Sequence, residues 1–168
     1  MALAEMVLGE VKAKEDLTLR LGDSLDVKAS IGLALILFLA TQTAYYFDKG
    51  LPYYGACLQK LSIVCIVLAA LFAVAELWPR KFFLPDPESD YVTRRIAELT
   101  EHYSQYPDAD SHIAGEFAKE TAQWTKVRIA DNQKKNKVKS ALLNWSFGFT
   151  LVAVILNLLT LLLIARIV

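Results

Sequence analysis

The run SALLNWSFGFTLVAVILNLLTLLLIA, residues 140–165, is twenty-six residues long and contains no charged side chain. At 1.5 Å rise per residue a helix of this length covers roughly 39 Å, more than the hydrocarbon thickness of about 30 Å. Residues 29–47 and 61–78 repeat the pattern; their one charge, Glu76, lies near the end of its run, where we expect it to reach the lipid headgroups. Three such runs predict three transmembrane helices rather than buried helices of a soluble core.

The composition agrees with this prediction. The 168 residues are 55% apolar, above the 45–50% or so of soluble domains. Eighteen basic and eighteen acidic residues cancel, so no overall field favours a nucleic acid polymer as partner. The charges are nearly absent from the three runs and dense between them, as expected for a polytopic membrane protein.

The distribution of Lys and Arg predicts the orientation, because cytoplasmic loops carry an excess of these residues. Residues 79–139 hold eleven, whereas the loop after the first run holds only Lys49 and Lys60. The N-terminus is therefore expected in the cytoplasm and the C-terminus outside. The predicted single domain runs in this order: a cytoplasmic N-terminal helix at 1–28, the first span at 29–47, an external loop at 48–60, the second span at 61–78, a cytoplasmic helical hairpin at 79–139 and the third span at 140–165.

The predicted fold class is all-α, with a cytoplasmic helical bundle formed by extensions of the first and third spans. No Gly or Pro interrupts residues 117–147, so the hairpin's second helix is expected to continue unbroken into the third span, from a cap at Ser111. Trp124 and Val127 lie on an apolar stripe of this long helix that is expected to face the stripe of the hairpin's first helix. The N-terminal helix, with a patchy apolar face that includes Leu17 and Leu21, is expected to be the third member of the bundle.

Small and polar residues recur at the spacing of four that lets helix backbones approach within a membrane. The two sets are Cys65, Ala69 and Ala73 on the second span, and Ser140, Asn144 and Gly148 on the third. We expect helix packing at both, either within one chain or between chains.

Two polar clusters lie just before the first and third spans and are candidate ligand-binding positions. They are Asp26 and Lys28 in the first, and Arg128, Asn132, Asn136 and Lys139 in the second. A structural role is one interpretation: Asp26 forms an ion pair with Lys139 or Arg128, or the bases bind anionic headgroups. Nucleotide binding is the other, since Arg, Lys and Asn donors suit a phosphate and a base.

Catalytic chemistry has little support in the sequence. Two histidines and two cysteines lie in no metal-binding pattern, and neither a Gly-rich phosphate loop nor a GxSxG motif is present. We therefore predict no enzyme activity, no catalytic residue, no metal and no cofactor.

The two clusters also resemble a known family. The segment LRLGDSLDVKASIGLALILFLA, with Asp26, Lys28 and Ala29, resembles the entry motif of small transmembrane effectors of bacterial Pycsar anti-phage systems. The segment RIADNQKKNKVKSALLNWSFGFTLVAVIL resembles that family's second signature, in which Asn132 or Asn136 is followed by Lys139. The related SLATT membrane effectors share the general plan.

This resemblance implies an effector in the bacterial inner membrane. A cyclic pyrimidine mononucleotide from a partner cyclase would bind Asp26, Lys28, Asn132 and Lys139 and drive homo-oligomerisation. The oligomer would then disrupt the membrane and cause abortive infection. The alternatives are a constitutive membrane scaffold, or a small channel subunit whose cytoplasmic bundle docks another protein.

Overall fold

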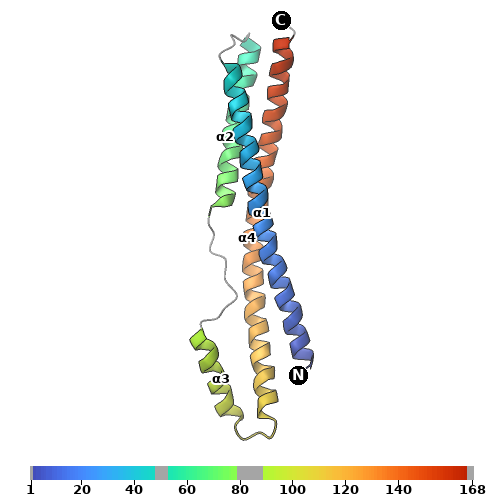
Figure 1. Ribbon diagram of the computed structural model, residues 1–168, viewed down its shortest axis with the longest axis vertical. Helices are drawn as coiled ribbons and strands as arrows, with labels where there is room; N and C mark the ends of the chain where they lie inside the picture. The colour runs from blue at the N-terminus through green and yellow to red at the C-terminus, as the bar shows by residue number, and fades with distance from the viewer. Residues whose placement is uncertain (1, 48–52, 79–88, 166–168) are drawn as a thin grey trace. The chain divides into compact units, whose positions relative to one another are not determined.

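The computed structural model describes residues 2–47, 53–78 and 89–165, and all four regular elements within them are helices. They are α1 (Ala2–Phe47), α2 (Tyr53–Leu77), α3 (Ser89–Tyr103) and α4 (Ala109–Ala165) (Figure 1). Residues 79–88, the start of the predicted hairpin, lie outside the described residues. Helix α4 begins at Ala109, two residues before the predicted cap at Ser111.

The predicted all-α membrane fold is confirmed. Three helices, α1, α2 and α4, are long and apolar enough to cross a bilayer, which makes the chain a multi-pass membrane protein. Helix α2 begins at Tyr53, so part of the segment predicted as a loop is helical. Helix α1 runs unbroken for 46 residues through Gly9 and Gly22.

By its internal contacts the chain divides into two compact units, where the sequence predicted a single domain. We call Met1–Leu21 with Arg80–Lys135 the charged unit, and Gly22–Pro79 with Asn136–Val168 the membrane unit. Helices α1 and α4 contribute to both, α2 lies in the membrane unit and α3 in the charged unit.

The buried residues of the long helices alternate at spacings of three and four. This is the heptad spacing of coiled-coil contacts, and we call these residues seam positions. On α1 they are Val11, Glu15, Thr18, Gly22, Leu25, Ala29, Gly32, Ile36, Leu39 and Thr43. On α4 they are Ala118, Ala122, Thr125, Ile129, Asn132, Asn136, Lys139, Leu143, Ser146, Thr150 and Ala153.

The residues that are buried at the seam differ from the apolar faces expected from the sequence. Leu17 and Leu21 are 67% and 52% exposed, so they lie off the α1 seam. Trp124 and Val127, 58% and 64% exposed, lie off the α4 seam, and the Trp124 ring meets Tyr91 of α3 edge-on with ring centroids 6.4 Å apart. Polar residues such as Glu15 and Asn132 are buried instead. The expectation for Leu17 and Leu21 was wrong, because small and polar residues fill the seam where large apolar side chains were expected.

In the membrane unit α1 and α4 run parallel, with α2 packed against both (Figure 1). The parallel register follows from two contacts at nearly equal sequence separation: Asp26 with Lys139, 113 residues apart, and Thr43 with Asn157, 114 apart. The apolar core joins all three helices through Ile36 and Leu39 of α1, Cys65, Ile66, Ala69 and Ala73 of α2, and Ala153 and Leu156 of α4.

Small residues allow the close approach of these helices. Ser146 donates a hydrogen bond to the Ala69 carbonyl at 2.9 Å, and a Cβ added at Gly32 would lie 3.3 Å from the Phe147 ring. Of the two predicted packing sets, Cys65, Ala69 and Ala73 are buried in this core. Asn144 and Gly148 are exposed and Ser140 is half-buried, so for this set packing between chains stays a prediction.

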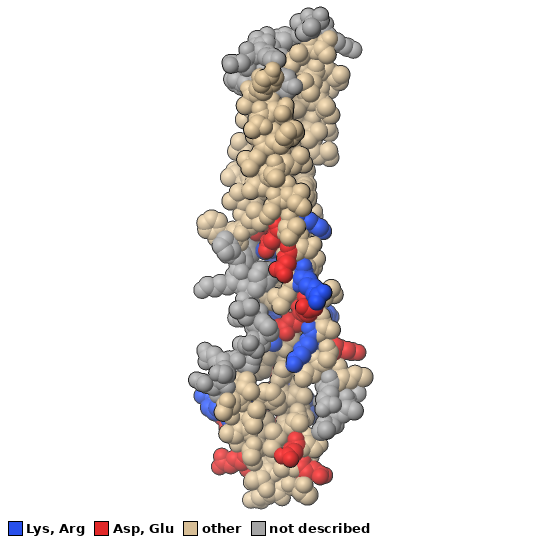
Figure 2. Space-filling view, in the orientation of Figure 1, with Lys and Arg blue, Asp and Glu red and all other residues tan. Residues whose placement is uncertain are grey.

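Lipid is the natural solvent for the remaining surface of the membrane unit. On the face drawn in Figure 2 no described residue in its upper part shows an acidic or basic side chain, and charged side chains gather where this stretch ends. Exposed aliphatic residues, including Ile31, Val64 and Leu151, cover the spans. Such a surface is stable only where hydrocarbon replaces water.

Hydrogen bonds among three polar residues connect the three spans: Thr43 of α1, Gln59 of α2 and Asn157 of α4. We call these three residues the polar clamp. The Asn157 amide donates to Thr43 Oγ1 at 2.9 Å, and Gln59 Nε2 donates to the Thr43 backbone carbonyl at 2.9 Å. Hydrogen bonds of this kind hold membrane helices in register because lipid offers the groups no alternative.

We expect Asn157→Leu to lower the free energy of unfolding in detergent by about 0.5–2 kcal/mol, the range for interhelical hydrogen bonds in membranes. Asn144→Leu is the matched control, because its amide lies on the exposed side of the same helix. Equal stability losses in the two variants, measured by thermal unfolding, would contradict the clamp.

Candidate functional site

In the membrane unit the structure joins two of the predicted site residues, Asp26 of α1 and Lys139 of α4. The Lys139 ammonium donates to Asp26 Oδ1. The two partners differ strongly in exposure: the side chain of Lys139 is 4% exposed and that of Asp26 is 42% exposed. The lysine is therefore enclosed, whereas the carboxylate keeps part of its contact with solvent.

The layer of residues beside this ion pair is a small apolar cluster. Leu25, Ala29 and Leu143 are buried together, and Leu77 of α2 packs against them. The contact places the last turn of α2 at the level where α1 and α4 enter the uncharged runs. This end of the membrane unit is thus closed by three helices.

Glu76, in that last turn of α2, does not lie where the sequence predicted. Its side chain was expected to reach the headgroups, but it is fully buried, with 0% exposure. It occupies a seam position of α2, three residues after Ala73 and seven after Ala69. Burying a carboxylate is costly unless partners compensate, so Glu76 marks this layer as electrostatically constrained.

The other candidates of the membrane unit lie apart from one another. Lys28 is exposed, because two helical residues beyond Asp26 correspond to a rotation of about 200°. Asn136 is 4% exposed at the seam position one turn before Lys139. The membrane unit therefore gathers Asp26, Asn136 and Lys139 on the α1–α4 contact and leaves Lys28 outside it.

In the charged unit Arg128 is bound by a residue that the sequence analysis missed. Its Nε donates to Glu15 Oε1 at 2.9 Å, and its Nη2 donates to Thr125 Oγ1 at 3.0 Å. The pair is largely enclosed, with side-chain exposures of 17% for Arg128 and 8% for Glu15. Glu15 and Arg128 are 113 residues apart, the same separation as Asp26 and Lys139.

Asn132, the remaining candidate of the charged unit, is fully buried at 0% exposure. Neither polar atom of its amide has a hydrogen-bond partner among the residues that the structure describes. Leaving a buried donor or acceptor without a partner costs about 1–3 kcal/mol per group. Asn132 is therefore a position where a polar residue is kept at the expense of stability.

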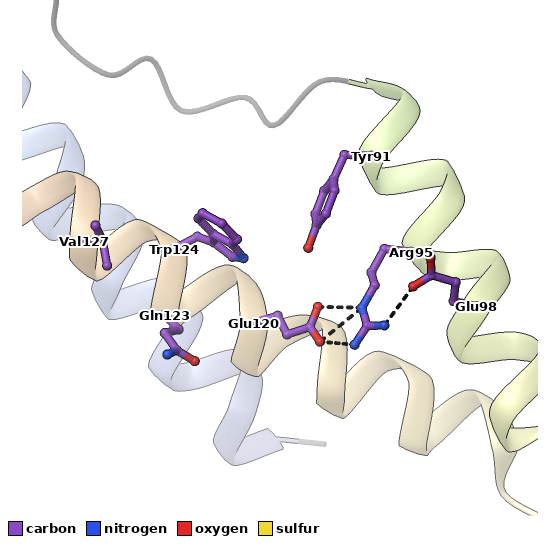
Figure 3. A pocket seen from close by; sticks show the side chains of 7 residues that line it. All are labelled: Tyr91, Arg95, Glu98, Glu120, Gln123, Trp124 and Val127. Atoms are coloured by element: carbon purple, nitrogen blue, oxygen red, sulfur yellow. Dashed lines mark hydrogen bonds and ion pairs between the residues drawn. The ribbon is translucent and has the colours of Figure 1, made fainter.

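The charged unit also contains an open pocket between α3 and α4, of about 510 Å³. Figure 3 shows the Tyr91 and Trp124 rings on facing sides, with Arg95 between two carboxylates. Arg95 Nε donates to Glu120 Oε2 at 2.9 Å, and its Nη1 donates to Glu98 Oε2 at 2.9 Å. One cation between two anions leaves the pocket net negative, which disfavours a phosphate ligand.

The juxtamembrane positions are chemically better suited to an anion than the pocket is. Lys139 offers an enclosed ammonium, and Asn136 an enclosed amide one turn away. The sequence indicated Asn136 and Lys139 as candidates, but it gave no signal for Glu15 and it placed Glu76 at the headgroups.

We expect Asn132→Leu to raise the free energy of unfolding, by up to about 1–3 kcal/mol, because a similar apolar volume replaces an amide without partners. Gln133→Leu, at the exposed neighbouring position, is the control and is expected to change stability little. Destabilisation by Asn132→Leu in thermal unfolding would show that the amide is satisfied and structurally required.

The contact between α3 and α4 is expected to weaken at acidic pH. The Arg95 guanidinium holds the pKa of Glu120 below its usual value, chiefly through their hydrogen bonds. A depressed pKa in the folded state stabilises the contact above the unfolded-state pKa of about 4.3, and this stabilisation is lost as pH falls through the folded-state value.

The fluorescence of Trp124 in a Trp78→Phe/Trp145→Phe background measures this loss. Glu120→Gln is expected to remove the acid-dependent change. Glu116→Gln is the control, since in the described residues Glu116 forms an ion pair with Lys119, three residues away on the same helix. A transition that persists in Glu120→Gln would assign the pH dependence to another group.

Comparison with known proteins gives no match to a family model, a curated protein or a solved structure. The resemblance of two short segments to Pycsar effectors therefore stays a prediction. The function must be argued from the residues and their geometry.

Proposed function

We propose that the chain is a membrane effector of bacterial anti-phage defence. In this proposal it senses a nucleotide second messenger, a cyclic pyrimidine mononucleotide supplied by a partner cyclase. Binding leads to homo-oligomerisation and disruption of the inner membrane, so that the infected cell is lost.

The observation that supports this proposal most is the enclosed ion pair of Lys139 with Asp26 where the spans begin. Enclosed basic groups at such a position are unusual, because a charge removed from water must be compensated. A phosphate is a natural partner for the lysine ammonium, and amides such as that of Asn136 can bind a base or a phosphate oxygen. The exchange of one anion for another at Lys139 would connect a soluble signal to the membrane helices.

The orientation in this proposal follows from the Lys and Arg distribution. Eleven basic residues between the second and third runs favour the cytoplasmic side for residues 79–139. The N-terminus would share that side, the C-terminus would lie outside, and the nucleotide would reach the Lys139 region from the cytoplasm.

Oligomerisation is part of the proposal because three spans of one chain are too few to enclose a lumen. Within the membrane unit the seam positions of α2 and α4 are filled by side chains such as Ala69, Ala73 and Ala153. A path for ions would therefore have to form between chains.

The second candidate function is a constitutive scaffold or a small channel subunit. The exposed Trp124 and Val127 favour it, because large apolar side chains on a polar unit are often covered by a partner protein. In that case the two ion pairs between α1 and α4 would only hold these helices in register.

A direct test is expression in a bacterial host with and without cyclic CMP or cyclic UMP, while a potential-sensitive dye reports on the membrane. We expect cells to tolerate the protein until the nucleotide is supplied and then to depolarise. Lys139→Ala is expected to weaken nucleotide binding by purified protein about ten- to a hundredfold, the worth of one hydrogen bond to a charged group.

Lys137→Ala is the matched control, since Lys137 is exposed two residues away on the same helix. It removes the same charge and should leave binding nearly unchanged. Cells indifferent to both nucleotides, together with stable co-purification of another protein, would favour the scaffold.

A further inference from the structure

The candidate site is closed in this structure, because Lys139 has no free approach. Only 4% of its side chain is exposed, and its ammonium is engaged by Asp26 Oδ1. An anionic ligand must therefore displace the Asp26 carboxylate before it can bind this ammonium.

We propose that the Asp26 carboxylate occupies the position that a ligand phosphate takes when it binds. This inference rests on the proposed function, in which Lys139 binds the nucleotide phosphate. Asp26 is then an internal competitor of the ligand and keeps the site closed until the signal arrives. The ligand class follows: an anionic phosphate able to replace a carboxylate on one lysine.

The difference in exposure decides which partner leaves. The Asp26 side chain is already 42% exposed and can rotate into water with little change in solvation. Lys139 would have to draw an enclosed ammonium out past the α1–α4 contact. Asp26 therefore leaves and Lys139 stays.

The exchange would loosen one end of the membrane unit and not the other. At the Asp26 end, α1 is held to α4 by the ion pair and the small cluster of Leu25, Ala29 and Leu143. At the other end the clamp of Thr43, Gln59 and Asn157 and the larger apolar core remain. Ligand binding would thus separate α1 from α4 where the spans begin.

The test is titration of the purified full-length protein with cyclic CMP, cyclic UMP and inorganic phosphate. Asp26→Asn removes the competing charge and keeps the shape, so we expect it to bind phosphate-bearing probes about two- to fivefold more tightly than the parent chain. Asp26→Glu keeps a carboxylate and should bind like the parent. Asp23→Asn, an exposed acid one turn earlier, is the control for net charge.

The outcomes separate this inference from the proposed function. Weaker or unchanged binding by Asp26→Asn, with binding lost in Lys139→Ala, would overturn the competition while leaving Lys139 as the phosphate site. Equal binding by the parent and Lys139→Ala, or no binding by any variant, would overturn both. Circular dichroism and gel filtration of Asp26→Asn confirm that a changed affinity belongs to folded protein.

Discussion

The parallel pairing of α1 with α4 is the constraint on which the rest of the structure depends. Within the charged unit it is held by Glu15 and Arg128, and within the membrane unit by Asp26 and Lys139, at the same sequence separation of 113 residues. Each pair joins a carboxylate of α1 to a base of α4. Because the seam positions recur at heptad spacing, a shift of register would separate these charges and bury them without partners.

The polar character of this contact distinguishes it from an ordinary helix core. Asn132, Asn136 and Lys139 occupy successive seam positions of α4, which in most coiled coils are filled by apolar residues. Polar residues at such positions can specify register and partner at a cost in stability. In a sensor the same cost has a use, since a contact that is only marginally favourable can be reversed by a ligand of moderate affinity.

The membrane unit carries its polar groups at two levels with different roles. The clamp of Thr43, Gln59 and Asn157 consists of neutral hydrogen bonds and is expected to stay closed. The pair of Asp26 and Lys139, with Glu76 in the neighbouring layer, consists of charges whose balance an anion can change. This asymmetry is why the proposed mechanism places movement at one end of the spans only.

The sequence alone determined that three apolar runs require lipid, that the chain is helical and that α4 continues through its span, since length, composition and missing helix breakers are local properties. It also indicated Asn132, Asn136 and Lys139 as polar candidates before the third span. Only the tertiary structure decided which side chains are buried, because polar residues fill the seam while Leu17, Trp124 and Val127 remain exposed. The burial of Glu76 and the pairing of Arg128 with Glu15 depend on helices far apart in sequence, and no local pattern encodes which of several carboxylates a base will meet.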